Sequence, residues 1–68
     1  MEQSEAIATA QQHAAAEGWD LGRYSPPTAD LEGTSWTVRF LGREPAPGNH
    51  FVVIVDDATG QVELWPGR

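Results

Sequence analysis

A short segment near the N-terminus is the only part of this chain with the composition of an α-helix, and this feature limits the fold more than any other. Residues 4–17 are strong helix formers, with an acidic residue in the first turn and Gly18 directly afterwards. Ile7, Ala10 and Ala14 recur at helical spacing, so the helix carries one apolar stripe of mostly small side chains. Beyond Gly18 the chain is divided by glycines and prolines and predicts strands and turns.

The residues after the helix predict how it ends and how the chain crosses to the next element. Gly18 suits the left-handed conformation that ends a helix, and Trp19 is placed to fold back on Ala14 as the hydrophobic contact of a Schellman cap. A turn around Gly22 and an extended stretch over residues 24–27 follow, because two adjacent prolines exclude helix.

Four later segments predict strands. Residues 35–41 alternate cleanly between the two faces of a strand, and residues 50–56 are almost continuously apolar, as expected of a central strand. Residues 61–65 close the sheet. Residues 29–32 predict a weak edge strand, and the sequence leaves open whether this strand pairs with the next.

The expected fold class is therefore α+β, with one N-terminal helix packed on a three- to four-stranded antiparallel meander. Residues 1–68 form a single domain in this interpretation. Residues 42–49, with two prolines and two glycines, predict a long hairpin loop.

The last hairpin fixes the register of the sheet. Its turn has the residues of a type I turn, with Asp57 at the first position and Gly60 at the fourth. A register that places Val55 beside Glu63 would mix a charge into the apolar face, whereas one that places Val55 opposite Val62 keeps that face apolar. The hydrophobic pattern selects the second register, with a four-residue loop.

This register gives the sheet two unlike faces. The face expected beneath the helix consists of Trp36, Val38, Phe40, Phe51, Val53, Val55, Val62 and Leu64. The other face is half apolar and consists of Thr37, Arg39, Leu41, Val52, Ile54, Gln61, Glu63 and Trp65. No further helix is available to cover it, and contiguous exposed apolar surface usually marks an interface. The candidate interface residues are Arg39, Leu41, Val52, Ile54 and Trp65.

Trp65 is the most informative of these candidates. Tryptophan is among the side chains that concentrate binding energy at interfaces. The alternative is that Trp65 folds over its own sheet edge and covers Leu41 or Ile54 within the chain. The sequence leaves both interpretations open.

The charge of the chain limits its partners. Ten acidic residues and four arginines, with no lysine, give a formal charge of −6. Nucleic acids and anionic membrane surfaces are bound by clustered cations, so neither is expected as a partner.

The absence of cysteine excludes disulfides and thiolate metal sites and fits a reducing compartment. Acids near the N-terminus, where an export signal needs positive charge, make the cytoplasm the expected location.

No catalytic or metal-binding pattern is present in the sequence. His13 and His50 have no ligand spacing between them, and the serines have no histidine at the spacing of an acyl-transfer site. The acids at residues 56–57 are better explained as turn-capping residues than as calcium ligands. We expect no enzymatic activity, cofactor or metal; that expectation would weaken if Asp30 and Glu32 met His50 in one cleft.

Several of these residues occur in an order that is also found in known protein families. After the helix ending at Gly18 come the strand Ser35-Trp36-Thr37-Val38 and the hairpin Val55-Asp56-Asp57-Ala58-Thr59-Gly60-Gln61-Val62. This order resembles small PepSY-type domains and the nuclear-transport-factor-like immunity proteins of bacteria. The likeness spans residues 7–64 and implies a helix on a meander that acts through protein contact, by peptidase inhibition or toxin neutralisation. It supplies no catalytic residue.

The sequence thus predicts a non-catalytic protein-interaction module, toxin-neutralising or inhibitory, that acts through the open side of its sheet. The first alternative is a structural homodimer in which two such faces meet. The length of 68 residues favours this alternative, because the hydrophobic core of so short a chain rarely contributes more than about 3–5 kcal/mol to the stability of the fold. A small-ligand-binding protein is the second alternative.

Overall fold

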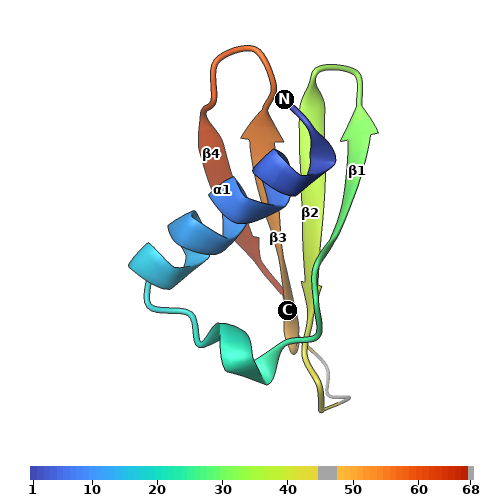
Figure 1. Ribbon diagram of the computed structural model, residues 1–68. Helices are drawn as coiled ribbons and strands as arrows, with labels where there is room; N and C mark the ends of the chain where they lie inside the picture. The colour runs from blue at the N-terminus through green and yellow to red at the C-terminus, as the bar shows by residue number, and fades with distance from the viewer. Residues whose placement is uncertain (45–47, 68) are drawn as a thin grey trace.

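The structure, a computed structural model, describes residues 1–44 and 48–67. These residues form one α-helix that lies across one face of a four-stranded antiparallel sheet (Figure 1), so the expected α+β fold class is confirmed. The elements in chain order are α1 (Gln3–Ala16), the 3₁₀ turn η1 (Leu21–Arg23), β1 (Thr28–Glu32), β2 (Ser35–Leu41), β3 (His50–Asp56) and β4 (Val62–Pro66). The strands lie side by side in the same order, so the first strand does pair with the second.

The helix and the four strands begin and end within one residue of their predicted limits. The predicted hairpin loop over residues 42–49 joins β2 to β3, and its residues 45–47 lie outside the described part of the chain. Within the described ranges, the helix lacks the length and apolar character needed to cross a bilayer.

Small side chains of α1 face the sheet. Ala6, Ala10 and Ala14 are fully buried, and their spacing of four residues places them in one row along the helix. The sequence pattern predicts Ile7 in this stripe, but Ile7 is only half-buried and Ala6 is the buried residue at the start of the row. A methyl group fits between helix and sheet where a longer side chain does not, so the alanine row brings α1 close to the strands.

The end of the helix has the predicted Schellman cap. The Trp19 N–H donates to the Ala14 carbonyl at 3.0 Å, and Gly18 has a φ of +93°. The indole of Trp19 packs on the sheet, with its centroid 4.3 Å from that of Phe51. The Tyr24 ring meets the same Phe51 edge-on at 4.9 Å, so one aromatic cluster ties the helix end and the crossing segment to β3.

The core lies between α1 and the sheet. The predicted register of the last hairpin is confirmed, because Val55 pairs with Val62. On the same face, Val38 of β2 pairs with Val53. The largest fully buried side chains are Phe40, Phe51, Val38, Val53 and Val55. All of them lie on the face that was expected beneath the helix.

The turn between β3 and β4 has the predicted four-residue loop but a different capping residue. The sequence predicts Asp57 at the first position of the turn, and this prediction is wrong. Asp56 holds the turn, because its Oδ1 accepts the N–H groups of Ala58 at 2.8 Å and Thr59 at 2.9 Å. The Gly60 N–H also donates to the Asp56 carbonyl at 2.8 Å. The turn therefore begins at the last residue of β3.

Candidate functional site

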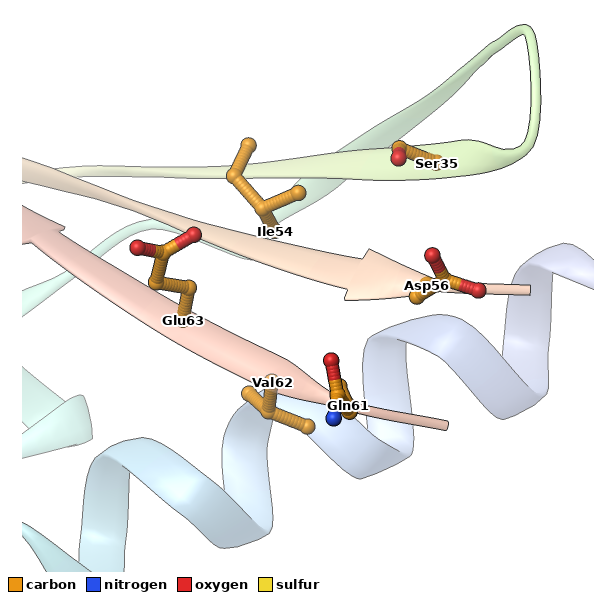
Figure 2. A pocket seen from close by; sticks show the side chains of 6 residues that line it. All are labelled: Ser35, Ile54, Asp56, Gln61, Val62 and Glu63. Carbon is orange, nitrogen blue, oxygen red and sulfur yellow. The ribbon is translucent and has the colours of Figure 1, made fainter. Parts of the chain in front are cut away.

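The face of the sheet turned away from α1 is not covered by any described element, and we call it the open face (Figure 1). Strand alternation and the observed register assign to it Thr28, Asp30, Glu32, Ser35, Thr37, Arg39, Leu41, His50, Val52, Ile54, Asp56, Glu63 and Trp65. Figure 2 shows Ser35, Ile54, Asp56 and Glu63 projecting from this face, with the helix behind the sheet. The open face spans all four strands.

An apolar strip crosses β2, β3 and β4 on the open face; it consists of Leu41, Val52, Ile54 and Trp65. Trp65 pairs directly with Val52, which pairs on its other side with Arg39. Leu41 is 60% exposed and Trp65 is 58% exposed. Val52 and Ile54 are half-buried between neighbouring strands.

Trp65 does not act as a lid within the chain. An indole folded over Leu41 would leave both side chains shielded, but more than half of each is accessible. The interpretation in which Trp65 covers Leu41 is therefore wrong. Ile54, the other residue named in that alternative, is half-buried and lies two residues along β3 from Val52, the pairing partner of Trp65. The structure brings all five candidate interface residues together, because Arg39 lies beside the strip.

Four carboxylates lie at one end of the strip on the open face. Asp30 and Glu63 lie in the same row as Ile54, one on β1 and the other on β4. Glu32 and Asp56 occupy the next row along the strands. Of these four, the sequence predicts only Glu63 on this face. The other three acids can be found from the sequence, because side chains alternate between the two faces every two residues. Applying this alternation to β1 and to the end of β3 places them on the open face.

Arg39 is the one cation among the described residues of the open face. Its Nη1 lies 2.7 Å from Oδ2 of Asp30 on the neighbouring strand, and both side chains are exposed. This pair neutralises one of the four carboxylates. The remaining acids give the open face a negative surplus beside an apolar strip.

The hydrogen bonds of the turn keep Asp56 charged. Backbone N–H groups of Thr59 and then of Ala58 hold the pKa of its carboxyl below the ordinary value, because both donors favour the ionised form. Asp56 therefore contributes a fixed negative charge to this end of the open face at neutral pH.

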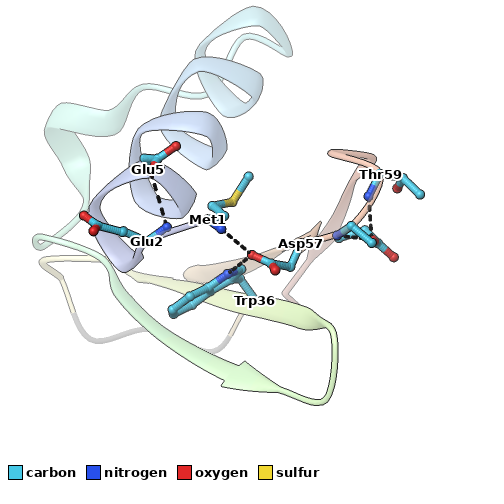
Figure 3. Close-up of polar contacts among 8 residues, drawn as sticks. Met1, Glu2, Glu5, Trp36, Asp57 and Thr59 are labelled. Carbon is cyan, nitrogen blue, oxygen red and sulfur yellow. Dashed lines mark hydrogen bonds and ion pairs between the residues drawn. The ribbon is translucent and has the colours of Figure 1, made fainter.

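The adjacent Asp57 has a different role. Its Oδ1 accepts the indole N–H of Trp36 at 3.1 Å and lies 3.1 Å from the Met1 ammonium (Figure 3). The Trp36 hydrogen bond, followed by that of the ammonium, lowers the pKa of Asp57. This carboxylate ties β2 and the start of α1 to the turn.

An open hollow of about 530 Å³ lies where the strip meets the acids (Figure 2). Its lining comes from β2, β3, β4 and the residue before β4, and consists of Ser35, Ile54, Asp56, Gln61, Val62 and Glu63. The lining is mostly polar, with two carboxylates beside Ile54 and Val62, and it suits a long, positively charged side chain of another molecule.

The outer edge of β1 is partly occupied by the chain itself. The side-chain amide of Gln3 donates to the Ala29 carbonyl at 2.9 Å, from the first turn of α1. A strand added at this edge would need the same carbonyl. Gln3 therefore competes with strand addition.

The outer edge of β4 offers few hydrogen-bond donors. The Gly67 N–H donates to the His50 carbonyl at 2.8 Å, and bonded pairs alternate along an antiparallel ladder. The backbone groups of Val62, Leu64 and Pro66 consequently point away from β3. Pro66 has no N–H, so only two outward donors remain on this strand.

The residues that would favour catalysis are not brought together. Asp30 pairs with Thr37, whereas His50 pairs with Leu41 at the far end of β2. Within residues 1–44 and 48–67 there is no group of three or more His, Cys, Asp or Glu side chains placed to hold a metal ion.

Comparison with known proteins gives no relative to set beside this geometry: no family model, curated protein or solved structure matches the chain. The resemblance to PepSY-type domains and bacterial immunity proteins stays a prediction from the sequence motifs.

Proposed function

We propose that this chain is a non-catalytic protein-interaction module that binds a partner protein through the open face. The observation that carries the proposal is the apolar strip, in which Leu41 and Trp65 are each more than half exposed and no described element covers them. Exposed apolar area of this kind on a small acidic chain costs solubility, so a partner that buries it explains its presence. Toxin neutralisation or inhibition is the form of contact that the sequence resemblance implies.

A structural homodimer is the second candidate, because two open faces stacked on each other would add apolar burial to a small core. Charge disfavours it. Each chain has a formal charge of −6, and stacking two open faces would bring like carboxylates together. We therefore favour a different protein as the partner, met in the cytoplasm, because a chain without disulfides fits a reducing compartment.

Two leucines of similar exposure provide a matched test. Leu41 lies on the open face and is 60% exposed, whereas Leu31 lies on the helix-side face of β1 and is 52% exposed. The tagged chain is purified with its bound proteins from the cells that express it, as the native sequence and as L41R, W65A and L31R. We expect a stoichiometric partner with the native chain and L31R, and loss of at least nine-tenths of it with L41R and W65A.

Equal recovery with L41R and L31R would contradict the proposal. Circular dichroism of each variant confirms that it remains folded. Sedimentation of the native chain across a hundredfold dilution tests the second candidate: a dimer that dissociates on dilution, and that L41R abolishes, would replace the partner protein with a second copy.

A further inference from the structure

We infer that the element of the partner that contacts the open face is a basic amphipathic α-helix. This inference rests on the proposed function and names the chemistry of the partner. It follows from the dimensions of the apolar strip, the state of the two sheet edges and the distribution of charge.

The strip has the width of one helix. It runs over β2, β3 and β4, and two inter-strand spacings of about 4.8 Å give about 10 Å. An α-helix with its side chains is about 10–12 Å across. Along the strands, the open face extends from Leu41 to Ser35, six residues or about 20 Å, which corresponds to a helix of about 13 residues.

The way in which helices and sheets pack in layers also favours a helix as the contacting element. The face that α1 leaves uncovered carries the apolar strip, and packing against a helix is a common way to cover apolar surface on a sheet. The alternative way for a sheet to bind a peptide is strand addition at an edge. Gln3 occupies the Ala29 carbonyl at one edge, and Pro66 shortens the donor row at the other. The face is therefore the better docking surface.

The charges specify a basic helix. Glu32 on β1 and Glu63 on β4 lie on either side of β2 and β3 on the open face, and Arg39 pairs with neither of them, because it binds Asp30. Asp56 and Glu63 also border the open hollow. A helix lying along β3 with an apolar stripe towards the sheet would direct Lys or Arg side chains from both its flanks to these acids. A second copy of this acidic chain cannot supply such charges from its own open face, where Arg39 already pairs with Asp30.

A designed peptide tests the inference without knowledge of the natural partner. The probe is a 14-residue peptide with leucines at helical spacing and lysines elsewhere, titrated into the isotope-labelled native chain and followed by NMR. Two control peptides have the same composition in scrambled order, or glutamate in place of every lysine. We expect the probe to shift backbone signals of β2, β3 and β4 with micromolar affinity, and both controls to bind at least tenfold more weakly.

Paired charge reversals locate the contact. E32K combined with E63K reverses two acids of the open face, whereas E2K combined with E17K makes the same change in charge at the two ends of α1. We expect the first variant to bind the probe at least tenfold more weakly and the second to bind within threefold of the native chain. Equal weakening in the two variants, or shifts confined to α1 or to β1, would overturn the inference.

The experiments can contradict the helical partner element without contradicting the proposed function. If the natural partner depends on Leu41 and Trp65 but the lysine probe binds no better than its controls, the helix is wrong and the open face still binds protein. If the natural partner is recovered equally with L41R and L31R, the proposed function itself is wrong.

Discussion

Two neighbouring carboxylates show how much a single position matters in this chain. Asp56 and Asp57 both have a lowered pKa, but Asp56 binds backbone N–H groups within its own turn. Asp57 binds Trp36, which is 21 residues away in the sequence. The first interaction is local and the second joins separate elements. Removing the two carboxylates therefore has different consequences for the fold.

The pH dependence of stability tests the role of Asp57. Its folded-state pKa lies below the ordinary value of 3.8, so its contribution is present above that pH and is lost as the pH falls through the folded value. We expect D57N to lower the free energy of unfolding at pH 7 and to match the native chain near pH 2. Urea unfolding, followed by tryptophan fluorescence at both pH values, measures this difference. E32Q is the control, because the Glu32 side chain makes none of the described hydrogen bonds; a pH-independent deficit in D57N would contradict the assignment.

At the scale of the elements, the contact between α1 and the sheet depends on side-chain size. Ala6, Ala10 and Ala14 have no exposed surface, and they face a sheet surface filled by larger residues. The space between the helix and the sheet is therefore filled mainly by the large side chains of the strands, and the small side chains of the helix take up little of it. The helix contributes little apolar area of its own, and its capping contacts with β3 matter correspondingly more.

A pair of alanine substitutions tests this packing. A10L inserts three carbon atoms at a position with no free surface, and we expect it to cost about 1–3 kcal/mol of the free energy of unfolding. A8L makes the same change at an exposed position of the same helix and should cost almost nothing. Urea unfolding of both variants measures the difference. Equal stability of the two would show that α1 is not held against the sheet in this way.

The whole molecule is small compared with the range of its own electrostatic field. Its principal extents are 33, 22 and 19 Å, and the Debye length is about 30 Å at 0.01 M salt but about 8 Å at 0.15 M. At low salt the ten acids therefore repel one another across the entire chain. This repulsion favours the expanded unfolded state, and salt relieves it.

We accordingly expect the midpoint of thermal unfolding to rise by several degrees between 0.01 M and 0.15 M sodium chloride. The variant E2K with E17K, which changes the formal charge from −6 to −2, should show a smaller rise. Thermal melts followed by circular dichroism at a series of salt concentrations measure both. A midpoint that falls with salt would mean that specific ion pairs, such as that of Arg39 with Asp30, outweigh the general repulsion.

Much of the fold was predictable because it is encoded in short-range patterns. Alternation with a period of two defined the strands, and a one-residue slip would have exchanged the faces, so the pairing of Val55 with Val62 followed from the sequence. The Schellman cap at Gly18 followed from a local motif in the same way. These patterns also indicated that one face of the sheet would lack a helix.

The remaining features depend on where distant segments meet. Local residues did not indicate that Asp57 would reach Trp36, that Gln3 would bind the Ala29 carbonyl, or that Trp19 would pack on the sheet. The sequence by itself determined the elements, their order and their two faces, because periodicity acts within a segment. Only the tertiary structure decided which side chains meet across segments and where the acids lie relative to the apolar strip, because those contacts depend on the relative placement of the helix and all four strands.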